Sequence, residues 1–147
     1  MNVGTYCRHH VVTIAPSADL AEAAARMRMS HVGLLVVVNP GETRPLGVLT
    51  DRDIVVEVVA ADLPPRMVTV RDAMTPNPVV ARESELLSVV CERMRSMGVR
   101  RVPVVDDMGN LVGIVASDDV LDVSAAMLFN LSSAAHKEQS RERSQRL

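Results

Sequence analysis

A short stretch between an apolar run and an amphipathic run carries the side chains best suited to chemistry. It reads TDRD, from Thr50 to Asp53, and it follows the apolar run LGVL. Thr50 and Asp53 have the spacing of a reciprocal capping box, in which each side chain binds the backbone N–H of the other residue. The same place suits a phosphorylated sugar, because free N–H groups at a helix start attract phosphate, Arg52 can pair with it and a carboxylate can accept both hydroxyls of a ribose. Capping and nucleotide binding are both open interpretations of this stretch.

A second stretch repeats the pattern of the first, but not its threonine and arginine. GVLTDRDIV, at 47–55, is matched by GIVASDDVL, at 113–121. The matched positions are Gly47 and Gly113, Thr50 and Ala116, Arg52 and Asp118, and Asp53 and Asp119. A capping box does not survive the loss of its hydroxyl unaltered, whereas the acid that a ribose needs is kept. The repeated glycines predict strands that a flat ring can approach closely.

Both stretches belong to an internal repeat that spans most of the chain. A shift of 67 residues places 3–38 on 70–105, and the shift becomes 66 at the second stretch. The residues of the first copy that recur unchanged are Val3, Val12, Ser17, Leu20, Arg26, Met27, Arg28, Val32, Val37 and Val38. Each copy predicts a β-α-β-β-α unit, and one such unit is too small to bury its own sheet. We therefore expect an α/β (α+β) fold in which two repeats share a core with pseudo-two-fold symmetry, so that equivalent loops face each other across a cleft.

Local signals place the helices of each copy. Leu20 and Met27 fall at helical spacing in the first copy, and Leu87 and Met94 do so in the second. The serines before them, at 17 and 84, stand where a helix N-cap belongs. Because no glycine or proline follows 113, the last helix can continue past 131 as a solvated helix end, and a disordered tail is the alternative.

The two copies together resemble a tandem pair of CBS domains over roughly residues 3–128. The resemblance rests on VVTIAPSADLAEAAARM, HVGLLVVV and LGVLTDRDIV in the first copy and on VRDAMTPNPVV, LLSVVCERMRSMGVRRVPVV and LVGIVASDDVL in the second. It predicts domains at 3–62 and 67–128, a linker at 63–66 and a tail at 129–147. It implies a regulatory module that senses AMP, ADP, ATP, NAD or S-adenosylmethionine, needs no cofactor and catalyses nothing.

The resemblance also implies two sets of binding residues. The family's pattern Gly-x-x-Ser/Thr-x-x-Asp matches the first copy completely and fails in the second at Ala116. One expected site contains Thr50, Arg52, Asp53, Arg100 and Arg101, and the other contains Thr13, His31 and Asp119. The first site looks complete, so we expect it to bind the nucleotide more tightly.

Composition excludes several other classes of function. The net charge is −2 with 16 basic and 18 acidic residues, and aromatic residues make up 1% of the chain, which argues against nucleic acid as a partner. Cys7, His9 and His10 lie close together, but the remaining ligands of a metal site are not apparent, so no metal is expected. Cys91 falls on an apolar helix face, as an inert buried thiol would.

The expected setting and partners follow from the same reading. No signal peptide and no membrane-spanning run are apparent, and we expect a cytoplasmic protein. The resemblance implies a homodimer formed through exposed helices and an effector protein that receives the signal. The alternative function is a protein-interaction module whose nucleotide sites are vestigial.

Overall fold

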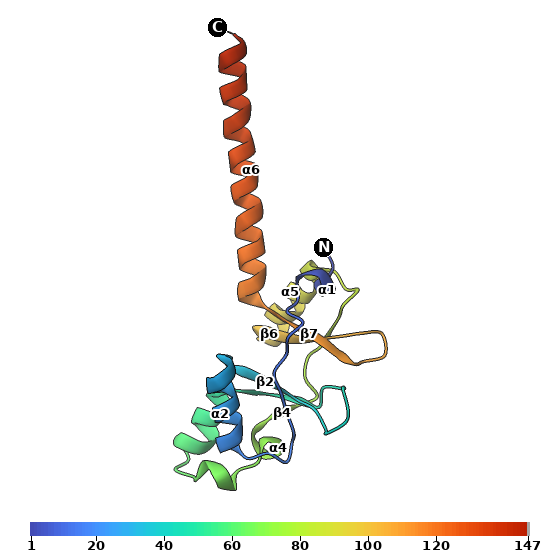
Figure 1. Ribbon diagram of the computed structural model, residues 1–147, viewed down its shortest axis with the longest axis vertical. Coiled ribbons are helices and arrows are strands. Elements are labelled where there is room, and N and C mark those ends of the chain that lie inside the picture. The colour runs from blue at the N-terminus through green and yellow to red at the C-terminus, as the bar shows by residue number, and fades with distance from the viewer. Residues whose placement is uncertain (147) are drawn as a thin grey trace.

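The computed structural model describes residues 1–146, and it consists of two small α/β halves and one projecting helix (Figure 1). In the lower half of the figure, a four-stranded sheet has the order β1-β2-β3-β4. Its strands are β1 (Thr13–Ile14), β2 (Leu34–Val37), β3 (Gly47–Thr50) and β4 (Thr75–Pro76). In the upper half, a three-stranded sheet has the order β5-β6-β7, with β5 (Ala81–Arg82), β6 (Arg101–Val105) and β7 (Leu111–Ala116). The predicted mixed α/β fold is confirmed.

The pairing of strands is the same in both halves. The first two strands of each sheet run parallel, and the second and third form an antiparallel hairpin. The helices and helical turns are α1 (Val3–Tyr6), α2 (Leu20–Ser30), α3 (Asp51–Ile54), the π-helical η1 (Val55–Val59), the 3₁₀ turn η2 (Pro65–Met67), α4 (Val70–Ala73), α5 (Leu87–Met97) and α6 (Ser117–Gln145). Helices α2 and α5 are amphipathic, and each packs its apolar face into the core of its own half.

The serine caps expected at the starts of α2 and α5 are wrong. The N-cap of α2 is Asp19, whose carboxylate accepts a hydrogen bond from the backbone N–H of Glu22 at 2.8 Å. Helix α5 begins after Leu86 without a side-chain cap. In both cases the helix starts three residues after the serine, since the chain first makes a turn.

Each half takes its first helical turn from the other repeat. Helix α1 lies with α5 and the upper sheet in Figure 1, and Val3 and Cys7 are buried in the core cluster of that half. Arg8 and Ile114 then exchange backbone hydrogen bonds of 2.8 and 2.9 Å, so the N-terminal segment extends the upper sheet beyond β7. Helix α4 does the same below, where Val70 is buried in the lower core and β4 extends the sheet beyond β3. The chain thus crosses between the halves twice.

The crossing segments occupy the space that the repeated glycines leave open. A Cβ atom at Gly47 would lie 2.8 Å from the carbonyl oxygen of Thr75, and one at Gly113 would lie 2.9 Å from that of Arg8. The glycines therefore permit close contact with a neighbouring backbone, and the expectation that they admit a ligand ring is corrected.

A repeated arginine ties helix to strand in each half. Arg26 donates a hydrogen bond of 2.7 Å to the carbonyl of Thr13, and Arg93 donates one of 2.8 Å to that of Val80. Arg93 also pairs with Glu85, and this hydrogen bond holds the pKa of Glu85 below its ordinary value. The recurrence of this residue in the repeat thus has a structural cause.

Helix α6 leaves the body and stands clear of both halves (Figure 1). It runs without interruption from Ser117 to Gln145, as the solvated-helix alternative predicted, and none of its residues is buried. Within residues 1–146, no helix combines the length and the apolar character that crossing a membrane requires.

Candidate functional site

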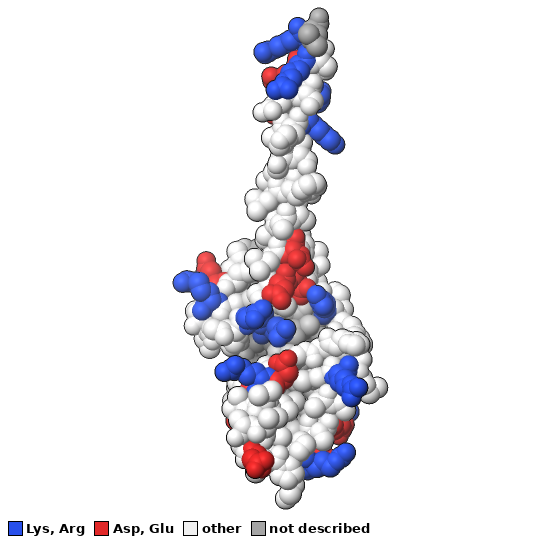
Figure 2. Space-filling view, turned by 90° about the vertical axis from the view of Figure 1, so that its left-hand side faces the viewer, with Lys and Arg blue, Asp and Glu red and all other residues white. Residues whose placement is uncertain are grey.

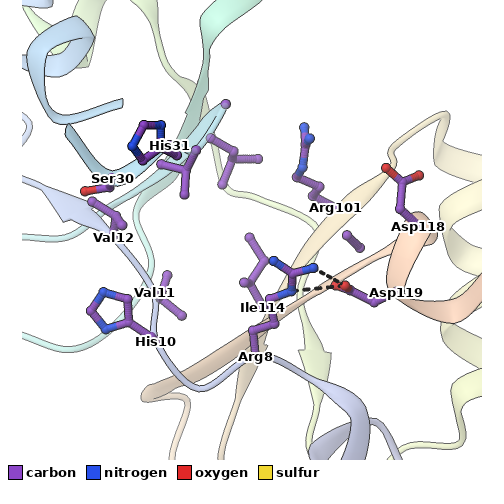
Figure 3. A pocket seen from close by; sticks show the side chains of 14 residues that line it. Arg8, His10, Val11, Val12, Ser30, His31, Arg101, Ile114, Asp118 and Asp119 are labelled. Atoms are coloured by element: carbon purple, nitrogen blue, oxygen red, sulfur yellow. Dashed lines mark hydrogen bonds and ion pairs between the residues drawn. The ribbon is translucent and has the colours of Figure 1, made fainter. Parts of the chain in front are cut away.

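A cavity of about 410 Å³ lies at the seam between the two halves (Figure 3). Five short segments line it: residues 8–12 of the N-terminal crossing segment, residues 30–34 between α2 and β2, the start of β6, the end of β7 and the first turn of α6. Because these segments come from both repeats, the cavity depends on how the two halves are packed together. Its size is within the usual range of small-molecule sites.

Asp119 is the acidic side chain that reaches furthest into this seam. It lies in the first turn of α6, and 16% of its side chain is exposed. The guanidinium of Arg8 donates hydrogen bonds to one carboxylate oxygen of Asp119, with an Nε–Oδ1 distance of 3.0 Å. This hydrogen bond raises the pKa of Arg8, whose side chain is otherwise 71% exposed. Figure 3 shows the pair at the foot of the cavity.

The aspartates in the first turns of α3 and α6 have different partners. In the first copy, Asp53 accepts a hydrogen bond of 2.8 Å from the backbone N–H of Thr50, and the Thr50 hydroxyl accepts one of 3.1 Å from the N–H of Asp53. The capping box predicted for this pair is therefore confirmed. Ala116 has no hydroxyl and makes no side-chain cap, and Asp119 is paired with Arg8 instead.

Basic and polar side chains line the same cavity. His31 and Ser30 enter the cavity from the end of α2, and Arg101 enters it from β6 (Figure 3). His31 adopts a left-handed backbone conformation with φ of 54°, which ends α2 and directs the chain into β2. Much of the remaining wall is aliphatic, with Val11, Val12, Val32, Leu34 and Ile114.

A second ion pair lies at the rim of the cavity. Arg100 approaches Asp118 at 3.4 Å, and the two side chains are 76% and 65% exposed. Figure 2 shows acidic and basic side chains gathered at the base of the projecting helix and across the waist below it. Because solvent screens exposed pairs, this contact adds little to stability and leaves both groups available to a ligand.

The structure brings together only some of the predicted site residues. His31 and Asp119, expected in one site, line the same cavity, and Arg101 lines it with them. The sequence had grouped Arg101 with Asp53, and the structure places it beside Asp119 instead. Thr13 lines a separate, smaller cavity of about 270 Å³. Thr50, Arg52, Asp53 and Arg100 lie outside both cavities.

The sequence analysis did not assign four of the polar lining residues to a nucleotide site: Arg8, His10, Ser30 and Asp118. Arg8 is the most important because it binds Asp119 across 111 positions of sequence. No local pattern in the sequence indicated this contact, because it depends on the N-terminal segment packing against the second repeat.

The cavity suits an amphiphilic ligand that carries both hydroxyl donors and negative charge. Asp119 accepts hydrogen bonds, Arg8 and Arg101 can pair with an anion, and the aliphatic wall can cover a flat apolar face. Within residues 1–146, no three His, Cys, Asp or Glu side chains are grouped so that they could hold a metal ion.

Comparison with known families gives one match that covers both halves. A family model described as the CBS domain matches residues 3–60 and again residues 70–126. An uncharacterised protein of Methanopyrus kandleri is 33% identical over 137 residues, which cover 93% of this chain and 69% of that protein.

Solved structures show the same arrangement. A CBS domain protein from Pyrobaculum aerophilum complexed with AMP has a TM-score of 0.78 and 26% identity, and the match covers 90% of this chain and 99% of that one. A CBS domain pair in complex with 5′-methylthioadenosine and S-adenosyl-L-methionine has a TM-score of 0.77 and 26% identity, with 86% and 98% of the two chains covered.

Proposed function

Because the chain belongs to the CBS domain family and carries two copies of that domain, we propose that it is a regulatory module that binds an adenosine-containing ligand in the cavity lined by Asp119. The tandem pair predicted from the repeat is confirmed by the two family matches. Two solved relatives contain AMP or a pair of adenosyl compounds, which supports this class of ligand. The observation that carries the proposal is a largely shielded carboxylate, opposite basic side chains, in a cavity that both repeats line.

Each part of the ligand has a counterpart in the cavity. The carboxylate of Asp119 accepts hydrogen bonds from the ribose hydroxyls, as acidic residues do in dinucleotide-binding folds. Arg101 and His31 attract the phosphate or another charged substituent. The valine-rich wall beside Leu34 covers the base, for which an aliphatic surface is sufficient. AMP, ADP, ATP, NAD and S-adenosylmethionine all share the ribose that Asp119 recognises.

The output of binding is a change in the packing of the two halves. His31 and Leu34 belong to the first repeat, whereas Arg101 and Asp119 belong to the second. A ligand that contacts all four favours one relative orientation and fixes the first turn of α6. The proposed module is not catalytic; it acts on an effector protein and associates with a second copy of itself.

We assign the other predicted residues to a second site of lower affinity. Thr50, Arg52, Asp53 and Arg100 occupy positions that the repeat relates to the Asp119 cavity. Asp53 lines neither of the two cavities described above, so a ribose bound there is less enclosed than one bound at Asp119. This assignment reverses the order of affinity that the sequence alone favours.

A thermal-shift measurement tests the proposal directly. We expect AMP, ATP, NAD or S-adenosylmethionine at millimolar concentration to raise the melting temperature of the full chain. A ligand present at 100 times its Kd stabilises the folded state by about 2.7 kcal/mol, which corresponds to a shift of roughly 5–10 °C. No shift with any of the four would contradict the proposal and favour a protein-interaction module with vestigial sites.

The ion pair between Arg8 and Asp119 predicts competition with the ligand. We expect Arg8→Ala to tighten the binding of adenosine by about 2–5-fold, because an exposed pair worth about 0.5–1 kcal/mol no longer has to be broken. AMP gains less, since its phosphate loses a cation that could pair with it. Isothermal titration of both ligands measures the difference, with Arg66→Ala as a control on an exposed arginine elsewhere. Weaker adenosine binding in Arg8→Ala would show that Arg8 supports the ligand and does not compete with it.

A further inference from the structure

The outer part of α6, residues 121–145, is a helix without a partner in this chain. We call it the α6 arm. None of its residues is buried, and Figure 1 shows it extending away from the body. Most of it also lies beyond residue 126, where the second match to the family model ends. An isolated helix gains little stability in water from its own hydrogen bonds, so a long projecting one needs packing from elsewhere.

The α6 arm carries an apolar stripe on one side. Leu121, Leu128 and Leu131 are 66%, 69% and 69% exposed, and their spacing places them on one face. Met127 and Ala135 continue the same face, and Phe129 lies at its edge. The stripe spans 121–135, which is about 21 Å of helix. A continuous exposed apolar surface of this kind marks an interaction site.

Charge is distributed unequally along the same helix. Its base carries Asp118, Asp119 and Asp122, and its free end carries four basic residues and two acidic ones over 137–146. Figure 2 shows acidic side chains at the base, an uncharged middle and mostly basic side chains at the free end. Two such helices attract each other when they run antiparallel, because acidic base then faces basic end. In a parallel pair like charges would face each other.

We propose that the α6 arm binds the α6 arm of a second copy in an antiparallel pair, with the two apolar stripes in contact. The inference takes from the proposed function only that the chain associates with a second copy of itself. The pairing of the arms does not depend on whether a nucleotide is bound. Superposing the centres of the stripes at Leu128 places Leu121 opposite the partner's Ala135. The acidic base of each helix then lies level with the basic free end of the partner helix, and a two-fold axis repeats both arrangements.

Light scattering after size exclusion tests the interface. We expect the full chain to be a dimer at micromolar concentration and the double variant Leu128→Glu/Leu131→Glu to dissociate at least about tenfold more readily, since glutamates would face each other in the seam. Met29→Glu, which changes an 81% exposed apolar residue on α2, is the matched control and should remain dimeric. A monomeric full chain, or a dimer that the double variant leaves intact, would overturn the proposal.

Cysteine cross-linking tests the orientation. In an antiparallel pair, Leu121→Cys and Ala135→Cys form few disulfide-linked dimers separately and cross-link efficiently when the two variants are mixed. In a parallel pair each variant would cross-link with itself, which would overturn the antiparallel assignment. The unaltered chain, with Cys7 and Cys91, gives the background.

The same samples separate this inference from the proposed function. Because one chain supplies the whole cavity at Asp119, the monomeric double variant should keep the thermal shift produced by AMP. Loss of the dimer with the shift retained therefore supports the role of the α6 arm alone. A nucleotide response that is absent in every variant would count against the proposed function and leave the arm unaffected.

Discussion

Asp119→Ala is expected to weaken the binding of AMP by about 100-fold. Two hydrogen bonds from ribose hydroxyls to a carboxylate are lost, and each contributes about 1.5 kcal/mol or more. Since about 1.4 kcal/mol corresponds to a factor of ten in Kd, their joint loss amounts to two orders of magnitude. Isothermal titration of the full chain with AMP measures this directly, and circular dichroism checks that the exposed start of α6 is still folded.

Two matched variants make this result specific. Asp118→Ala removes the neighbouring carboxylate, which also lines the cavity but is 65% exposed and paired with Arg100, so the loss should be no more than a few-fold. Asp53→Ala tests the equivalent position of the first repeat, where we expect a smaller effect. If Asp53→Ala weakened AMP binding as much as Asp119→Ala or more, the order of affinity predicted from the complete sequence motif would be correct and our assignment would be wrong.

The elements of the fold were predictable because the same order of apolar and amphipathic segments occurs in both copies of the repeat. Periodicity in the segments that start at Leu20 and Leu87 predicts α2 and α5, and the absence of glycine and proline after Gly113 predicts that α6 continues. The helix starts were harder. Ser17 has good capping chemistry, but it is Asp19 that accepts the hydrogen bond from the N–H of Glu22. Glu85 is held by Arg93 and by the backbone N–H of Arg82. Local propensity does not reveal which of several polar side chains wins such a competition.

The candidate site was predictable only in part because its two sides come from different repeats. Asp119 follows from the repeat, and His31 follows from the resemblance to the CBS domain family. Arg8 does not, because its contact with Asp119 arises from the N-terminal segment crossing to the other half. The change of Thr50 to Ala116 was visible in the sequence as a lost cap. The pairing of Asp119 with Arg8 in the seam depends on tertiary packing and was not visible there.

The repeated glycines give the second large prediction, which concerns stability. We expect Gly113→Ala to lower the free energy of unfolding by about 1–3 kcal/mol, the usual cost of overpacking a closely packed position. The added Cβ would lie 2.6 Å from the sulfur of Cys7 and 2.9 Å from the carbonyl oxygen of Arg8. A backbone carbonyl cannot turn aside as a side chain can, and this one also accepts the hydrogen bond from the N–H of Ile114 at 2.9 Å. The N-terminal segment must therefore move off β7 or the strand must bend.

Gly33→Ala is the matched control, because its new Cβ meets a different kind of neighbour. It would lie 2.9 Å from a carboxylate oxygen of Asp51, which rotation about the side chain can remove. We expect a loss within about 0.5 kcal/mol, measured like that of Gly113→Ala by urea denaturation. Hydrogen exchange adds a local readout, since Gly113→Ala should deprotect the backbone N–H groups of Arg8 and Ile114 while Gly33→Ala leaves them protected. Equal losses in the two variants, with those amides still protected, would mean that the added Cβ does not displace the crossing segment from β7 and that the predicted cost of Gly113→Ala is wrong.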